Sequence, residues 1–90
     1  MFGREGLAMA NRRDENERFE VILTDLGSRR ITVIKLIREV LGFELGRAKD
    51  FAENLPQAVA WNVTNEEAWS MMRRFEQVDA GVRLKSIGSP

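Results

Sequence analysis

Residues 19–41 read FEVILTDLGSRRITVIKLIREVL and contain the two patterns that decide the fold. Apolar residues first occupy every second position, at Phe19, Val21 and Leu23, which predicts a half-buried strand over residues 19–24. After a break around Gly27, the apolar residues recur at the spacing of a helix. A strand followed at once by an amphipathic helix indicates a fold in which helices pack on a sheet.

The helix is predicted to run from Arg29 to Leu41, because Gly42 stops it. Ser28 stands directly before it and is predicted to be its N-cap. With Val33 at zero and about 100° per residue, the helix buries one stripe that includes Ile37. The first helix therefore presents one face to the core and leaves its other faces for solvent or a partner.

Working outward, similar patterns predict a helix over 44–54, a strand over 58–63, a helix to about residue 78 and a strand over 82–85. Thr64 and Glu67 form the signature of a capping box at the start of the third helix. The order strand, helix, helix, strand, helix, strand predicts an α/β (α+β) two-layer sandwich. The predicted core comprises Phe19, Val21, Leu23, Val33, Ile37, Leu41, Ala48, Ala52, Met71, Phe75, Val82 and Leu84.

The chain is predicted to contain one domain. Residues 1–17 combine charge with little periodic hydrophobicity and are expected to form a flexible leader. The folded domain is expected over residues 18–86, followed by a tail over 87–90.

The composition disfavours several classes of function. Cysteine and histidine are both absent, which removes disulfides, thiol nucleophiles and the usual general base and metal ligand. We therefore expect no catalytic residues, no metal site and no cofactor. No stretch is apolar enough to span a bilayer or to act as a signal peptide, so a cytoplasmic location is expected, without membrane contact.

Two isoleucines share a second face of the first helix with two cations. Relative to Val33, Ile34 lies at about 100° and Ile31 at about 160°, with Arg38 at about 140° and Lys35 at about 200°. Apolar anchors surrounded by cations are typical of a protein-binding surface. The alternative is that the leader or the second helix covers both isoleucines.

The third helix shows a weaker feature of the same kind. Trp69 and Met72 lie beside its core stripe. They either pack on Trp61 and the leader or form a second contact with a partner.

From Phe19 to Lys85 the sequence resembles the C-terminal domain of the bacterial large-subunit ribosomal stalk protein, the L-seven/L-twelve family. The matching segments are Phe19 to Leu23, Val33-Ile34-Lys35 with Arg38, Gly42 through Asp50, Pro56 with Ala58, and Val82 with Lys85. The resemblance implies a three-stranded antiparallel sheet. It also implies that the first two helices recruit translational GTPases, among them elongation factors Tu and G. The family's contact residues correspond to Arg30, Ile31, Ile34, Lys35, Arg38 and Lys49.

Departures from the family leave the partner open. Only about seventeen residues precede the domain, so we expect a stand-alone relative without the N-terminal dimerisation domain, and its association with ribosomes stays uncertain. Arg47 stands where the family usually has an acidic residue. An alternative is an adaptor or regulator that binds another cytoplasmic protein with an acidic surface.

Three further alternatives rank lower. The adaptor that delivers N-degron substrates to the Clp protease shares the fold, but its acidic turn and its pocket histidine are absent here. A nucleic-acid binder is disfavoured because tyrosine is absent and Phe43 is the one aromatic residue among the basic side chains of residues 28–49. An enzyme is disfavoured by the missing side chains described above.

Overall fold

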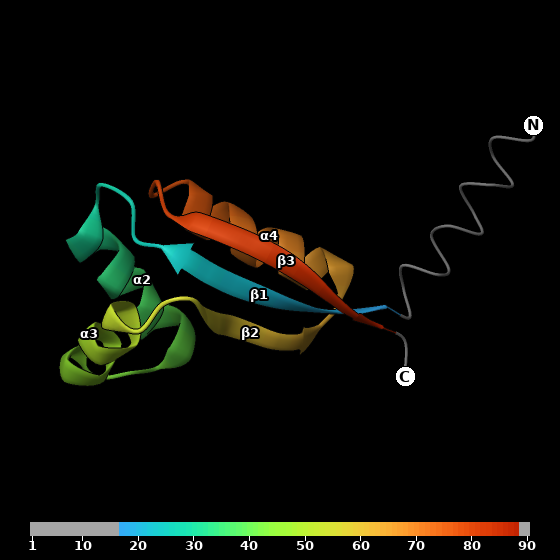
Figure 1. Cartoon of the computed structure of the whole chain (residues 1–90), viewed down its shortest axis with the longest axis horizontal. Coiled ribbons are helices and arrows are strands. Elements are labelled where there is room, and N and C mark those ends of the chain that lie inside the picture. The colour runs from blue at the N-terminus through green and yellow to red at the C-terminus, as the bar shows by residue number, and fades with distance from the viewer. Residues whose placement is uncertain (1–16, 89–90) are drawn as a thin grey trace, which may run out of the picture.

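The structure, a computed structural model, describes residues 17–88. Its elements are β1 (Arg18–Asp25), α2 (Arg30–Leu41), α3 (Leu45–Glu53), β2 (Gln57–Val63), α4 (Asn65–Glu76) and β3 (Gly81–Gly88), as Figure 1 shows. The predicted order of elements and the α/β sandwich are confirmed. Apart from Glu17, the predicted leader lies outside the described residues.

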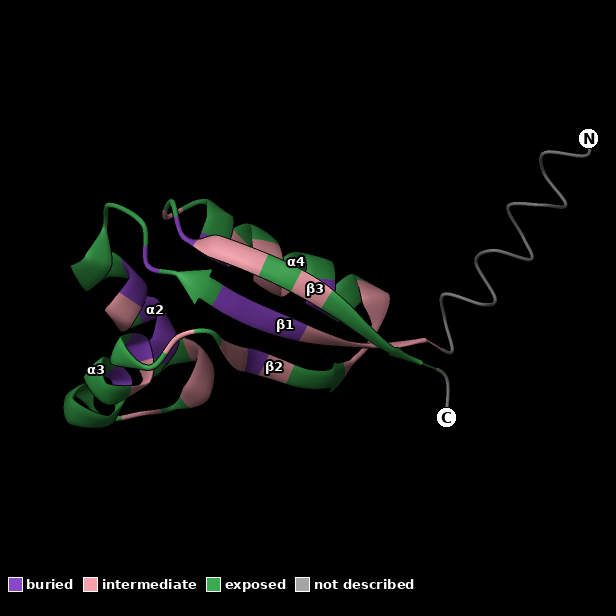
Figure 2. Ribbon diagram, viewed as in Figure 1, coloured by how far each residue is buried: buried purple, intermediate pink, exposed green. Residues whose placement is uncertain are grey.

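The three strands form one antiparallel sheet in the order β2-β1-β3. Strand β1 is central, and its side chains Val21 and Leu23 are fully buried in a core shared with residues of all three helices (Figure 2). Ile22 is also buried but is not part of that core cluster. Because neighbouring side chains of a strand point to opposite faces, Ile22 lies on the face that the helices leave uncovered.

The two outer strands pair with β1 in different ways. The β1–β3 register is regular from Phe19 opposite Ser86 to Leu23 opposite Val82. The β1–β2 register is interrupted twice, between Phe19 and Val21 and between Val21 and Ile22. The β1–β3 pairing also has two register shifts, but they lie at its ends, between Arg18 and Phe19 and between Leu23 and Asp25. The shifts on the β2 side fall within the paired stretch, where bulges bend and twist a strand.

Predicted boundaries needed small corrections. Helix α2 begins at Arg30 rather than Arg29, and α4 ends at Glu76, two residues before the predicted end. Strand β3 continues to Gly88, so residues 87 and 88 belong to the sheet and not to a tail. The strand extends because Arg18, at the start of β1, provides a partner for Gly88.

Most of the predicted core residues are buried, but the prediction also included residues that are only half-buried. Five predicted core residues are half-buried and pack against the core from its rim: Phe19, Leu41, Met71, Val82 and Leu84. The buried cluster also contains residues outside that list of core residues: Leu26, Leu36, Val59, Ala68 and Ala80. The rim positions lie at strand ends, on the outer strand or at helix margins, where the small second layer does not cover them.

The loop before α2 is fixed by the turn before β3. Gly27 has φ +69°, and a Cβ atom built on it would lie 1.8 Å from the carbonyl oxygen of Asp79. The Ser28 hydroxyl donates a hydrogen bond to the Asp79 carboxylate, with an O–O distance of 2.5 Å. The prediction that Ser28 caps α2 was therefore wrong: the N-cap is Arg29, which makes no side-chain capping bond. The hydroxyl is used for a tertiary contact instead.

The capping box of α4 is confirmed. The Thr64 hydroxyl accepts a hydrogen bond from the Glu67 amide, and the Glu67 carboxylate accepts one from the Thr64 amide. These two bonds satisfy amide groups that a helix start otherwise leaves without partners.

Candidate protein-binding surface

Helix α2 buries Val33, Leu36 and Ile37 and turns Ile31 away from them. The Ile31 side chain is 73% exposed, the largest exposed fraction among the large hydrophobic residues that the structure describes. An isoleucine in this position contributes little to folding, because folding removes little of its surface from water. Within residues 17–88, nothing covers Ile31, so the alternative in which the second helix buries it does not apply.

Ile34 occupies an intermediate position. It is half-buried and packs against the core cluster from its margin. This agrees with its place on the helix, between the buried stripe and Ile31. Ile34 is therefore less exposed than Ile31, and replacing Ile34 would change stability as well as any surface.

Four of the predicted contact residues are cations, three on α2 and one on α3. Arg30, Lys35 and Arg38 of α2 and Lys49 of α3 are all exposed. In the part of the chain that the structure describes, the one salt bridge joins Arg74 to Glu39, so these four cations have no ion-pair partner there. We use the name α2–α3 surface for Arg30, Ile31, Ile34, Lys35, Arg38 and Lys49.

The connection between the two helices holds them in a fixed relation. Gly42 ends α2 in the left-handed conformation, with φ +70°, and its amide donates to the Arg38 carbonyl at 2.8 Å. The Phe43 ring then packs edge-on against Phe51, with 5.9 Å between ring centroids, and the Arg47 guanidinium lies 4.2 Å from the centre of the Phe43 ring. The sequence indicated Arg47 only as an additional cation, and its contact with Phe43 was not predicted.

Leu45, the first residue of α3, was also missed. Its side chain is 46% exposed, and it precedes Lys49 by one helical turn. Helical periodicity offered no signal for its exposure, because Leu45 lies only about 60° from Ala48 and about 20° from Ala52, on the side of α3 that is otherwise buried. Residues four apart lie on the same face of a helix, so Leu45 places a further apolar side chain beside Lys49.

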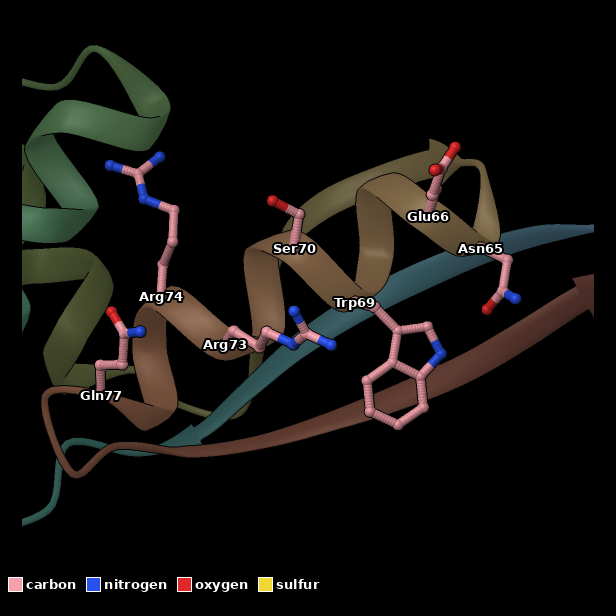
Figure 3. Close-up of a pocket in the computed structure, with 7 residues that line it drawn as sticks. All are labelled: Asn65, Glu66, Trp69, Ser70, Arg73, Arg74 and Gln77. Atoms are coloured by element: carbon pink, nitrogen blue, oxygen red, sulfur yellow. The ribbon is translucent and has the colours of Figure 1, made fainter.

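The second predicted contact is on α4, away from α2 and α3. Trp69 is 47% exposed and Met72 is half-buried. Trp69 belongs to a pocket along the outer side of α4, shown in Figure 3 with its lining residues. Trp61, on β2, is 69% exposed, so neither tryptophan is buried by the other. The α2–α3 surface and Trp69 are therefore separate features.

Two carboxylates in the described part of the chain have pKa values shifted by hydrogen bonds. Hydrogen bonds from Thr64 hold the pKa of Glu67 below its ordinary value, and those from Ser28 do the same for the pKa of Asp79. Both carboxylates serve turns or caps. Across residues 17–88, no three acidic, histidine or cysteine side chains gather as metal ligands, and no helix there is long and apolar enough to cross a membrane.

Comparison with known proteins gives a consistent result. The family model of the ribosomal protein L7/L12 C-terminal domain matches residues 19–85. The large ribosomal subunit protein bL12 of a Nitratiruptor species is 42% identical over 83 residues, which cover 92% of this chain and 63% of that protein. The bL12 proteins of a Thermoanaerobacter species and of Geobacillus thermodenitrificans are 43% and 41% identical, over 80% and 79% of this chain and 58% of each relative.

The chain thus spans less than two thirds of the length of these relatives, and the family match over residues 19–85 includes all or most of every helix and strand of the described structure. The family match also covers all six residues of the α2–α3 surface. The chain belongs to the ribosomal protein L7/L12 family, in the region of its C-terminal domain.

Proposed function

We propose that this chain is a non-catalytic recognition module of the ribosomal stalk, and that it recruits translational GTPases through the α2–α3 surface. The observation that carries the proposal is Ile31, a 73% exposed isoleucine on a helix that also carries three exposed cations, none of which forms a salt bridge within residues 17–88. Relatives named as ribosomal proteins support a non-enzymatic function at the ribosome, and hence in the cytoplasm.

The proposed surface divides its work between two kinds of side chain. Burial of Ile31, with the exposed part of Ile34, removes apolar surface from water and supplies affinity. Lys35, Arg38 and Lys49 lie exposed around it and attract an acidic partner surface, which raises the association rate more than the affinity. Salt screens such exposed charges, so the two contributions separate experimentally.

The test is surface plasmon resonance against a purified elongation factor. Ile31→Asp should weaken binding at least about tenfold, because it removes a central apolar anchor. Ile31 is a cleaner probe than Ile34, since Ile34 also packs on the core. Ile87→Asp is the matched control: Ile87 is 43% exposed and lies on β3, away from this surface.

Charge reversal at Lys35 or Arg38 should mainly slow association and flatten its dependence on ionic strength. Circular dichroism should show that all variants remain folded. Equal affinities for Ile31→Asp and Ile87→Asp would show that the factor does not bind at the α2–α3 surface.

A further inference from the structure

The two flanks of α4 face different edges of the sheet. Glu67, Met71 and Arg74 line one pocket together with Ala60 and Val63 of β2, so this flank faces β2. Trp69 lies about 160° around the helix from Met71, on the opposite flank.

That opposite flank faces β3. Helix α4 packs against β3, and Figure 3 shows the Trp69 ring projecting from α4 toward that strand. Met72 lies on the helix between Trp69 and the buried Phe75. Trp69 and Met72 therefore lie on the side of α4 that faces β3.

The outer edge of β3 is open in the described structure. In the order β2-β1-β3, this strand pairs with β1 on one side and with no strand among residues 17–88 on the other. Its pairing is uninterrupted over Val82–Ser86 and has register shifts only at its two ends, whereas the two shifts of the β1–β2 pairing fall within the paired stretch and Asn62 of β2 has φ 54°. A regular edge exposes a row of backbone donors and acceptors that can pair with another strand.

The two sides of β3 have different chemistry. Val82 and Leu84 lie opposite Leu23 and Val21, whose side chains are buried under the helices. They therefore point to the side on which α4, and with it Trp69, lies. Arg83 and Lys85 alternate with them, are exposed, and point to the uncovered face of the sheet.

We propose that the open edge of β3 takes up an extended segment of a partner protein as a fourth strand, and that acidic and apolar residues alternate in this segment. Backbone pairing at an edge supplies affinity, and alternate side chains supply specificity. The acidic residues of the segment lie beside Arg83 and Lys85 on the uncovered face, and its apolar residues lie on the side of Trp69 and Met72. Opposite charges across neighbouring strands stabilise pairing.

A second copy of this chain fits the edge less well. Two β3 strands paired about a twofold axis perpendicular to the sheet would place Arg83 and Lys85 of both copies on one face. Like charges on directly opposed strands destabilise pairing, and charged edge residues commonly prevent such self-association. The cations of β3 thus disfavour self-pairing and favour an acidic partner.

The first experiment uses the full chain labelled with ¹⁵N and a synthetic seven-residue peptide of alternating valine and glutamate, capped at both ends. We expect amide shifts concentrated at Val82–Ser86 and at the Trp69 indole. A peptide of the same composition in which the valines and glutamates are grouped should bind at least about tenfold more weakly, because it cannot match both sides of β3. A valine–lysine peptide should not bind measurably.

Edge pairing has a further signature that side-chain contacts alone would not give. Alternate amides of a paired strand point toward and away from β3. Peptides N-methylated on one alternate set of amides should lose binding, and those methylated on the other set should keep it.

Variants of the chain test the two sides separately. The double variant Arg83→Glu with Lys85→Glu should exchange preference and bind the valine–lysine peptide instead. Trp69→Ala should weaken binding of the glutamate peptide about tenfold. Trp61→Ala is the matched control, since it removes an exposed tryptophan from the other edge strand and should change nothing. If Trp69→Ala unfolds, the charge exchange and the methylated peptides still test the proposal.

Three results would overturn the proposal: no shifts in β3 at millimolar peptide, equal binding of the grouped peptide, or concentration-dependent shifts in β3 without peptide, which would identify a second copy as the occupant. Ile31→Asp should leave peptide binding unchanged, so failure here is distinct from failure of GTPase recruitment.

Discussion

Helices α2 and α4 both contain twelve residues and both bury one apolar stripe, but their ends differ. Helix α4 begins with the capping box of Thr64 and Glu67, has acidic residues in its first turn and has two arginines in its last. Helix α2 has no side-chain cap and no acidic residue in its first turn, where Arg30 stands instead. The amino end of a helix carries partial positive charge, so a cation there is unfavourable.

The two helices differ in how closely their ends follow the local rules for helix stability. The ends of α4 agree with its local sequence, as expected for a helix selected for stability. The first turn of α2 departs from these rules at Arg30, which belongs to the α2–α3 surface. Local rules are commonly broken at functional sites, with the loss offset elsewhere. In α2 the compensation is burial of Val33, Leu36 and Ile37.

The largest expected change in stability tests whether α4, like α2, is stabilised mainly by burial of its apolar side chains rather than by its caps. Phe75 is fully buried, so Phe75→Ala should lower the free energy of unfolding by about 3–5 kcal/mol. Urea unfolding followed by circular dichroism measures this change. Ile37→Val in α2 is the milder comparison, expected to cost about 0.5–1.5 kcal/mol. If Phe75→Ala unfolded like the wild type, the caps would dominate α4 and the comparison would fail.

The start of α2 has no side-chain cap, so its conformation should depend on the contact of the preceding loop with Asp79. In Gly27→Ala the new methyl group would meet the Asp79 carbonyl in a backbone conformation unfavourable for alanine. We expect a loss of at least about 2 kcal/mol. Gly46→Ala in α3 is the control: its Cβ would have no neighbour within 4 Å, and alanine should add about 0.5–1 kcal/mol. Equal unfolding midpoints for both variants would contradict this account of the loop.

The contrast between the helices also explains which features could be predicted from sequence. The order of elements, the stop at Gly42 and the cap at Thr64 depend on residues close in the chain, and all were predicted. Ser28 was misassigned because its hydroxyl bonds to Asp79, fifty-one residues away. No local pattern contains that contact.

The candidate surface was predictable to a similar degree. Helical periodicity separated Ile31 from the core, and the structure agrees. Periodicity could not predict how far the neighbouring elements cover Ile34, nor that the Arg47 guanidinium stacks on the Phe43 ring. The open edge of β3 was also beyond local reasoning, because strand order and bulges are properties of the assembled sheet.

An intermediate effect compares the two helix starts directly. Thr64→Ala removes the cap of α4 and should cost about 1 kcal/mol at pH 7. Arg29→Asp introduces a capping residue at α2 and removes a cation from its amino end, so it should raise stability by up to about 1 kcal/mol. Thermal unfolding of both variants gives the two signs. If Arg29→Asp lowered the stability instead, the missing side-chain cap would not be a weakness of α2.

The same cap makes a prediction about pH. Backbone and side-chain hydrogen bonds at Thr64 lower the pKa of Glu67 in the folded state. Its contribution to stability is therefore present above the ordinary glutamate pKa of about 4.3 and is lost as pH falls through the lower, folded value. The stability difference between wild type and Thr64→Ala should shrink between pH 5 and pH 3. An undiminished difference at pH 3 would assign the effect of Thr64 to something other than the ionised carboxylate.

The smallest effect concerns the salt bridge that joins the two helices, where Arg74 Nη2 lies 2.8 Å from Glu39 Oε1. Both side chains are substantially exposed, at 42% and 69%, so water and salt screen their attraction. A double-mutant cycle with Glu39→Gln and Arg74→Gln should give a coupling of about 0.2–1 kcal/mol at low ionic strength and almost none at 1 M salt. A larger coupling that persisted in salt would mean that α2 and α4 stabilise each other directly at the surface. A small, screened coupling would mean that α2, with its unfavourable first turn, depends on the shared core, and that its exposed cations remain free to meet a partner.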